Sequence, residues 1–256
     1  MCKKIGFALL ISLMLCSNLM GQDVLKIKDI LLHISRAYDT SANLSFKLRF
    51  VNKIESASGK IASDKTEGKY ALIGKNAFYI MGDIEVMQND SFFVAVYNRD
   101  KFIIVSTPKS NASTQFFPFR ETMDSLLKLS ADKYLIKLNT SKSERLETII
   151  FSAKDTLEKV KEFRLVYNSG SSMISSISYL FHEYKASDED YKEENPQMIL
   201  QKKTILIEFE DYSHNKLDTS ILSEKKYIFF ENGECKLTER YRDFKLYYSP
   251  SPVLKN

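Results

Sequence analysis

The chain has 256 residues, of which 44% are hydrophobic and 27% are charged. This composition excludes a disordered or collagen-like chain and supplies enough apolar surface for a sizeable core. Only eight Gly and five Pro are present, which excludes Gly-rich linkers, Pro-rich stalks and most glycine-dependent phosphate motifs. The 37 basic and 33 acidic residues are spread along the chain, so no basic stripe indicates nucleic-acid binding.

The first 21 residues have the form of a secretory signal peptide. Two lysines precede an apolar run over residues 5–16, which is shorter than the ~20 residues that span a membrane. Small Gly21 lies where a signal peptidase would cut. Cys16 resembles a lipoprotein acylation site by position, but Leu15 stands where such sites carry a small residue, which argues against lipidation. We therefore expect an exported, periplasmic protein without a membrane-spanning helix in the mature chain.

The mature chain begins with a helical pattern and then becomes strand-rich. Apolar residues recur every three or four positions from about Val24 to Asp39, which predicts one amphipathic helix. Residues 44–50 then alternate apolar and polar, which predicts a strand with one buried face. Further strand patterns lie at 67–73, 77–81, 84–87, 92–97, 101–106, 134–138, 146–151, 163–167, 173–184, 204–209, 227–230, 235–237 and 244–248, with a short helical pattern at 119–129 between them.

The connections between the early strands are short. Because parallel strands need crossovers of a dozen residues or more, these hairpins predict an antiparallel meander. Asn232-Gly233 is the strongest hairpin signal, since this pair accepts the positive φ angles of a type I′ turn. The strands at 92–97 and 102–105 are apolar on both faces, so we expect both faces to be covered.

These patterns predict a mainly β protein with some helix, of the α+β class. About a dozen antiparallel strands make a sheet wide enough to curl, so we expect a curved sheet that forms an incomplete, half-open β-barrel. The N-terminal amphipathic helix and the short helix at 119–129 accompany it. No linker or internal repeat is present, so we expect a single domain over residues 22–256, after the signal peptide over residues 1–21.

The order of these elements resembles that of the LolA/LolB-type lipoprotein carriers. The similarity covers roughly residues 24–106: the leader and opening helix are followed by Leu44-Ser45-Phe46-Lys47-Leu48-Arg49-Phe50, Gly68-Lys69-Tyr70-Ala71-Leu72 and Asn76-Ala77-Phe78-Tyr79-Ile80. In that family an unclosed barrel wraps around helices and shields lipid chains in a hydrophobic concavity during periplasmic transport. This chain is longer than the family pattern. Arg49 follows the kind of strand that carries the family's lid-fixing arginine, and this match rests on that one residue.

The resemblance implies a carrier that binds a lipid or a lipidated protein, exchanges it with envelope proteins, and needs no cofactor or metal. The candidate residues of the apolar wall are Phe46, Leu48, Phe50, Tyr70, Leu72, Phe78, Ile80, Phe93 and Tyr97. The candidate lid is the helix at 119–129, with Phe119, Met123, Leu126 and Leu127 on one face. A non-catalytic interaction or scaffold protein of the envelope on the same fold is the alternative, because a fold does not decide function.

An enzyme is the weakest of the three hypotheses. His33, His182 and His214 have no metal-ligand spacing, and the sequence lacks the common hydrolase and nucleotide-binding motifs. Glu208 and Glu210 lie on one strand face by period two and would make either an acid/base pair or a solvent-facing stripe. After leader cleavage Cys235 is the one cysteine left, and its strand pattern indicates a small buried hydrophobe rather than a catalytic thiol.

Overall fold

The structure is a computed structural model that describes residues 26–38, 43–56, 59–108, 133–140, 145–186 and 198–249. The signal peptide, the helix predicted at 119–129 and its four candidate lid residues lie outside the described residues. Residues 26–38 are helical, as the opening pattern predicted. No helix among the described residues is long and apolar enough to cross a membrane.

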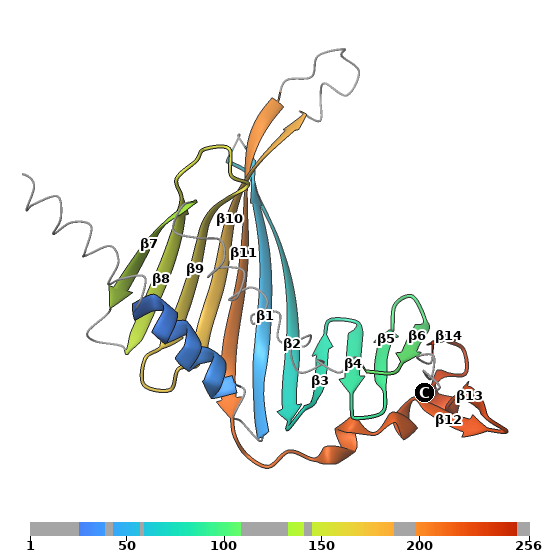
Figure 1. Ribbon diagram of the computed structural model, residues 1–256. Helices are drawn as coiled ribbons and strands as arrows, with labels where there is room; N and C mark the ends of the chain where they lie inside the picture. Colours follow the sequence, from blue (N-terminus) through green and yellow to red (C-terminus); the bar gives the residue numbers. More distant parts are fainter. Residues whose placement is uncertain are drawn as a thin grey trace, which may run out of the picture. The chain divides into compact units, whose positions relative to one another are not determined.

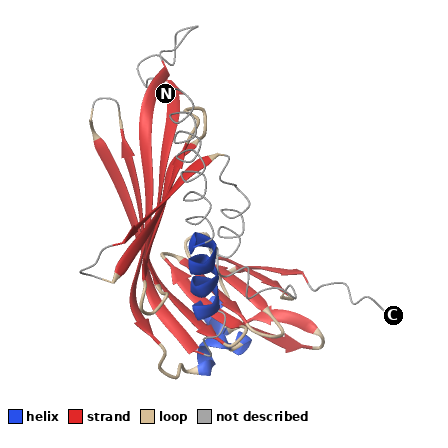
Figure 2. Ribbon diagram, turned by 60° about the vertical axis from the view of Figure 1, so that its left-hand side comes forward, coloured by secondary structure: helices blue, strands red, loops and turns tan. Residues whose placement is uncertain are grey.

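Strands dominate the described chain (Figure 2). Each predicted strand segment is found, which confirms the mainly β class. The strands are β1 (Asn43–Glu55), β2 (Ile61–Ile73), β3 (Asn76–Met81), β4 (Ile84–Gln88), β5 (Phe93–Tyr97), β6 (Phe102–Ser106), β7 (Tyr134–Thr140), β8 (Leu146–Ala153), β9 (Val160–Asn168), β10 (Ile174–Ala186), β11 (Met198–Ser213), β12 (Ile228–Glu231), β13 (Glu234–Leu237) and β14 (Lys245–Ser249). Three 3-10 helices are added: η1 (Thr219–Leu222), η2 (Glu224–Lys226) and η3 (Glu239–Tyr241).

Twelve strands pair in the order β14-β6-β5-β4-β3-β2-β1-β11-β10-β9-β8-β7, and β12 pairs with β13 as a separate hairpin (Figure 1). The meander from β2 to β6 is antiparallel, as predicted. Strand β14 is an exception, because it pairs parallel to β6. The purely antiparallel prediction is therefore wrong at this edge, where the long chain between the two strands supplies the crossover that a parallel pair needs.

The chain divides into two compact units. Unit 1 comprises Met1–Asp39, Asn52–Ser63 and Met123–Leu206, and unit 2 comprises Thr40–Val51, Asp64–Thr122 and Ile207–Asn256. Strands β1, β2 and β11 each contribute residues to both units.

The core of unit 1 is formed by the N-terminal helix and one face of the sheet strands β7–β10. The helix buries four residues spaced three or four apart, which satisfies the amphipathic pattern. One of them, Tyr38, accepts a hydrogen bond from the backbone N–H of Ile174 in β10, at 3.0 Å. The buried residues of this core include Ile27, Leu31, Ile34, Tyr38, Ile149, Phe151, Phe163, Leu165, Ile174 and Ile177.

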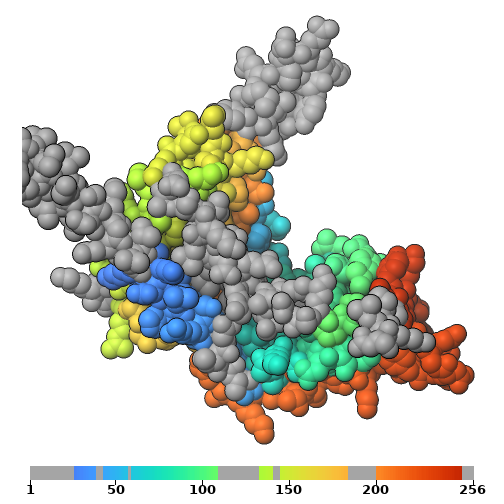
Figure 3. Space-filling view, viewed as in Figure 1, coloured from blue at the N-terminus to red at the C-terminus, as the bar shows by residue number. Residues whose placement is uncertain are grey.

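The core of unit 2 lies between one face of strands β3–β6 and the segment that follows β11. Sheet residues Met87, Val94, Val96, Ile103 and Val105 pack against this segment, which adds Leu222, Tyr227, Ile228 and Tyr241. In Figure 3 the segment, in orange and red, borders the green strands. The face is covered by short 3-10 helices and the β12-β13 hairpin rather than by α-helices. Asn232 and Gly233 have φ angles of 52° and 82°, which confirms the predicted turn.

Candidate functional site

The register of strands β2 to β6 assigns every side chain of unit 2 to one of two faces. Residues that are directly opposite on paired strands lie on the same face of a sheet. One row runs through Tyr70, Tyr79, Val86, Ala95 and Ile104. We call the face that carries this row the aromatic face. The other face, which packs against the segment after β11, is called the C-terminal face.

Seven of the nine candidate wall residues belong to the aromatic face. Leu72 and Phe93 fall in one row through Ala77 and Gln88, and Tyr97 falls in a row with Gly68. Phe46 stacks on Tyr70, and alternation along β1 adds Leu48 and Phe50. The other two candidates are on the opposite side, because Phe78 pairs with Ala71 and Ile80 pairs with Lys69. They lie on the C-terminal face.

The rings of the aromatic face contact one another across strands. Phe46 and Tyr70 stack with centroids 5.0 Å apart, and Tyr70 stacks on Tyr79 at 5.9 Å. Tyr97 stacks on Phe102 at 4.3 Å. Cross-strand aromatic pairs of this kind stabilise a sheet and present a continuous, polarisable apolar surface.

A left-handed residue in β11 adds two rings that sequence reasoning missed. Phe209 and Tyr212 both contact Phe46, with centroids 5.8 and 5.2 Å away, although strict alternation would place them on opposite faces. Asp211 between them has a φ of 55°. A bulge of this kind shifts the alternation by one residue and turns both rings to the same side. No Gly marks the position, so the sequence carries no plain signal of it.

The aromatic face is mostly withdrawn from solvent. Phe46, Tyr70 and Leu72 are 4%, 5% and 7% exposed, while Leu48, Phe50, Phe93 and Tyr97 are half-buried. Burial raises the pKa of Tyr70 well above its ordinary value. A charged group would therefore be strongly disfavoured at this face.

One polar side chain on the aromatic face has an unsatisfied atom. Gln88 is 3% exposed, and its buried Oε1 has no hydrogen-bond partner. Its register neighbours are Ala77 and Phe93. A buried, unpaired amide oxygen costs about 1–3 kcal/mol. Its presence among apolar side chains is unusual for a core that serves packing alone.

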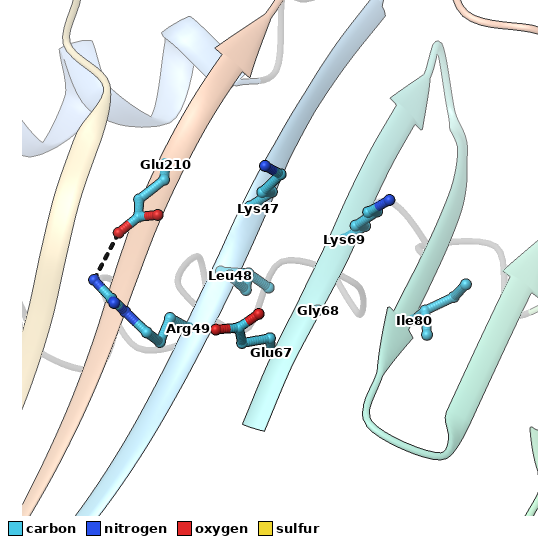
Figure 4. Close-up of a pocket in the computed structure, with 8 residues that line it drawn as sticks. All are labelled: Lys47, Leu48, Arg49, Glu67, Gly68, Lys69, Ile80 and Glu210. Carbon is cyan, nitrogen blue, oxygen red and sulfur yellow. Dashed lines mark hydrogen bonds and ion pairs between the residues drawn. The ribbon is translucent and has the colours of Figure 1, made fainter. Parts of the chain in front are cut away.

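A polar pocket of about 390 Å³ lies on the C-terminal face, beside β1, β2 and β11 (Figure 4). Arg49 is one of its lining residues and donates to Glu208 at 2.7 Å and to Glu210 at 2.8 Å. Lys47 pairs with Asp211 at 2.6 Å. These carboxylates therefore form ion pairs with basic side chains rather than an acid/base pair. Arg49 faces away from Phe46 and is not on the aromatic face, while two of the candidate wall residues, Leu48 and Ile80, line this pocket with it.

A buried carboxylate secures the segment after β11 to the C-terminal face. Glu85, 7% exposed, accepts a hydrogen bond from Lys226 Nζ and another from Tyr227 Oη, each at 2.5 Å. Burial, and then the hydrogen bond to Glu85, raises the pKa of Tyr227. The neighbouring Tyr241 Oη is buried without a partner. This cluster is structural, because it fills the core between the sheet and its cover.

The histidines and Cys235 show no catalytic arrangement within the described part of the chain. His33 Nδ1 contacts the carbonyl oxygen of Asp29 at 2.7 Å, and His214 contacts that of Asn43 at 3.3 Å. His182 lies in a groove of about 960 Å³ in unit 1. No group of three or more His, Cys, Asp or Glu side chains in the described ranges is placed to hold a metal ion. Cys235 is half-buried and packs beside the core of unit 2, in line with the predicted apolar role.

No protein-family model matches this chain, and no curated protein sequence matches it. Solved structures do match. An uncharacterized conserved protein from Thermus thermophilus shares 5% identity and a TM-score of 0.43, over 88% of this chain and 99% of that one. A LolA superfamily protein from Nitrosomonas europaea shares 10% identity and a TM-score of 0.31, over 77% and 97%. A chain of the Pseudomonas aeruginosa MucA/MucB complex shares 14% identity and a TM-score of 0.37, over 82% and 62%.

Structures of LolA superfamily proteins are thus among those to which this chain is similar, as the order of elements in the sequence predicted. The identities and TM-scores describe a likeness and nothing more.

Proposed function

We propose that this protein is a non-catalytic periplasmic carrier that shields a lipid, or the acyl chains of a lipidated protein, against the aromatic face of unit 2. In this proposal the sheet forms a half-open barrel like that of LolA-type carriers. The observation that carries the proposal is the pair of apolar faces on the same strands. One face packs against the protein's own C-terminal segment, and the other carries stacked rings from Phe46 to Tyr79.

The chemistry of the aromatic face fits acyl chains. Burying each methylene contributes about 0.8 kcal/mol, so a dozen carbons give a useful affinity after the entropy losses of binding. Rings that stack at 5–6 Å present flat apolar surfaces without charge. The unsatisfied Oε1 of Gln88 supports a ligand with a hydrogen-bond donor near its chain, such as an acyl amide or a hydroxyl group.

The burial of Phe46 and Tyr70 adds a requirement to this proposal. Because these rings are at most 5% exposed, they must become accessible when cargo arrives. The half-buried Phe50 and Tyr97 are the positions where cargo makes its first contact. Binding is then coupled to opening of the aromatic face, which is a shift between two populations of the protein.

The test is lipid analysis of the protein purified from the envelope of its own host. We expect extracted lipid or acylated peptide to appear by mass spectrometry in about equimolar amount. Tyr97→Glu puts a charge on the aromatic face and should abolish the bound lipid. Lys69→Glu, a matched change on the C-terminal face, should leave it unchanged. Protein that is free of lipid in both the native and the Lys69→Glu forms would refute the carrier proposal.

A scaffold protein of the envelope is the second candidate. It is favoured by four exposed aromatic side chains in β12 and β14: Phe229, Phe230, Tyr247 and Tyr248. Exposed aromatic clusters mark surfaces that bind other proteins. A scaffold would retain its partners when Tyr97→Glu removes any lipid, whereas a carrier would lose its cargo.

A further inference from the structure

The hairpin strand β12 and the edge strand β14 each carry two exposed aromatic side chains. Eight large hydrophobic side chains are strongly exposed among the described residues, and the aromatic ones are Phe229, Phe230, Tyr247 and Tyr248, at 44%, 47%, 47% and 39%. Single exposed apolar residues are common, but a concentration of rings marks an interaction surface. Phe230 lies between Phe92 and Tyr248, with ring centroids 5.8 and 6.1 Å away.

Strand β14 is the last strand in the sheet order and has β6 as its one neighbour among the described strands. The backbone N–H of Lys245 donates to the carbonyl oxygen of Lys101 at 2.9 Å, while Lys245 is in register with Phe102. In a parallel pair, alternate residues direct both of their backbone groups toward the same neighbour. Lys245, Tyr247 and Ser249 therefore bond to β6.

It follows that Leu246 and Tyr248 direct their N–H and C=O groups away from β6. Each residue carries one donor and one acceptor, so the outer edge of β14 presents two of each. Within the described residues, no backbone hydrogen bond uses these groups. A row of unpaired backbone groups is a template for another extended strand. An acyl chain has no groups that could satisfy it.

We propose that this edge binds the same edge of a second copy of the chain, as an antiparallel pair of β14 strands with the two-fold axis at Tyr247. In this register Leu246 of each copy lies opposite Tyr248 of the other. These are the outward-directed residues, and each such pair exchanges both of its hydrogen bonds. The outward N–H and C=O groups of Leu246 and Tyr248 in both copies then all have partners. No other two-fold register that keeps these residues paired within β14 achieves this.

The side chains agree with this register. Lys245 lies opposite Ser249 of the second copy, so no like charges meet. The two Tyr247 rings lie beside each other on the aromatic-face side, where Phe102 already contacts Tyr247 edge-on at 5.9 Å. Tyr248 and Phe230 gather on the other side. A single strand pair buries less than the ~1,600 Å² of a standard interface, so we expect a weak, concentration-dependent dimer.

Disulfide trapping tests the register directly. In a Cys235→Ala background, Tyr247→Cys should form a covalent homodimer under mild oxidation, because residues opposite each other at the axis have Cα atoms about 4.5 Å apart. Lys245→Cys should not cross-link with itself but should cross-link with Ser249→Cys when the two variants are mixed. Equal self-linking of Lys245→Cys and Tyr247→Cys would overturn the register.

Light scattering of the protein that carries none of the cysteine substitutions tests the interface itself. Tyr248→Pro removes one outward N–H from each copy and leaves the bonds to β6 intact. We expect it to abolish the dimer, whereas Tyr248→Ala, which keeps the N–H, should weaken dimerisation less. Circular dichroism should show both variants folded. A native protein that stays monomeric up to its solubility limit, or a Pro variant that dimerises as well as the Ala variant, would overturn the proposal.

Discussion

The buried carboxylate of Glu85 offers a quantitative test of how the C-terminal segment is held. Replacing Glu85 by Leu keeps about the same volume but removes the acceptor for Lys226 and Tyr227. The hydroxyl of Tyr227, a fully buried residue, is then left without its acceptor, which costs about 1–3 kcal/mol. The side chain of Lys226 is 32% exposed and regains water, so its lost ion pair adds at most about 1 kcal/mol.

We therefore expect Glu85→Leu to lower the free energy of unfolding by about 2–3 kcal/mol. Urea unfolding followed by circular dichroism measures the change, with the slope held constant as a check that the unfolding reaction is the same. Glu85→Gln is the matched control, because it keeps an oxygen acceptor for Tyr227. The double change Glu85→Leu with Tyr227→Phe removes donor and acceptor together and should recover about 1 kcal/mol or more relative to Glu85→Leu alone. An unaltered stability of Glu85→Leu, or no recovery in the double variant, would refute this reasoning.

Three further predictions follow from the same unit. Tyr241→Phe should raise stability by about 1 kcal/mol in urea unfolding, because it removes a buried hydroxyl that has no partner; a loss of stability would show that the hydroxyl is satisfied in solution. The pKa of Tyr227 is raised in the folded state, so its contribution is complete below about pH 10 and is lost as the pH rises above it, at up to ~1.4 kcal/mol per pH unit. Tyr227→Phe should therefore make the decline of stability above that pH less steep, and an unchanged slope would contradict the shift. Arg49→Met should cost no more than about 1 kcal/mol in unfolding, because its ion pairs are partly exposed, and should leave lipid binding unchanged, since Arg49 is not on the aromatic face; loss of lipid would restore it as a lid-fixing residue.

Alternation along the sequence was sufficient to locate the strands, but it left their lengths too short. The N-terminal half of β2, from Ile61 to Thr66, is almost entirely exposed and carries Asp64 and Lys65. No apolar period marks it, because pairing with its neighbours rather than burial of a face holds it extended. Strand β11 likewise extends beyond the predicted segment at 204–209 at both of its ends.

The parallel pairing of β14 with β6 could not be read from the sequence. It joins residues more than a hundred positions apart, and no local turn specifies it. The apolar character of both faces around Phe93 to Tyr97 predicted that both faces are covered, and the structure shows such a layer on the C-terminal face. This pattern did not predict that the layer on the C-terminal face is the chain's own segment from η1 to η3.

The candidate wall shows the limit of period-two reasoning. Alternation gives the relative faces within one strand, and it grouped Phe78 with Ile80 as it grouped Tyr70 with Leu72. Whether two such groups on neighbouring strands share a face depends on the turn that joins the strands. The turn at Gly74, with a φ of 61°, pairs Ala71 with Phe78, so the group of Tyr70 continues into Ala77 and Tyr79 instead. A shift of one residue in that turn would have exchanged the two groups.

A carrier requires contact between acyl chains and the aromatic face, and site-specific photo-cross-linking measures that contact. A benzophenone side chain at Tyr97 or Phe50 samples the aromatic face, and the same group at Lys69 or Arg49 samples the C-terminal face of the same strands or their neighbours. After irradiation in the host envelope, we predict lipid adducts by mass spectrometry at Tyr97 and Phe50 and none at Lys69 and Arg49. Adducts confined to the C-terminal face, or equal at all four positions, would contradict the account.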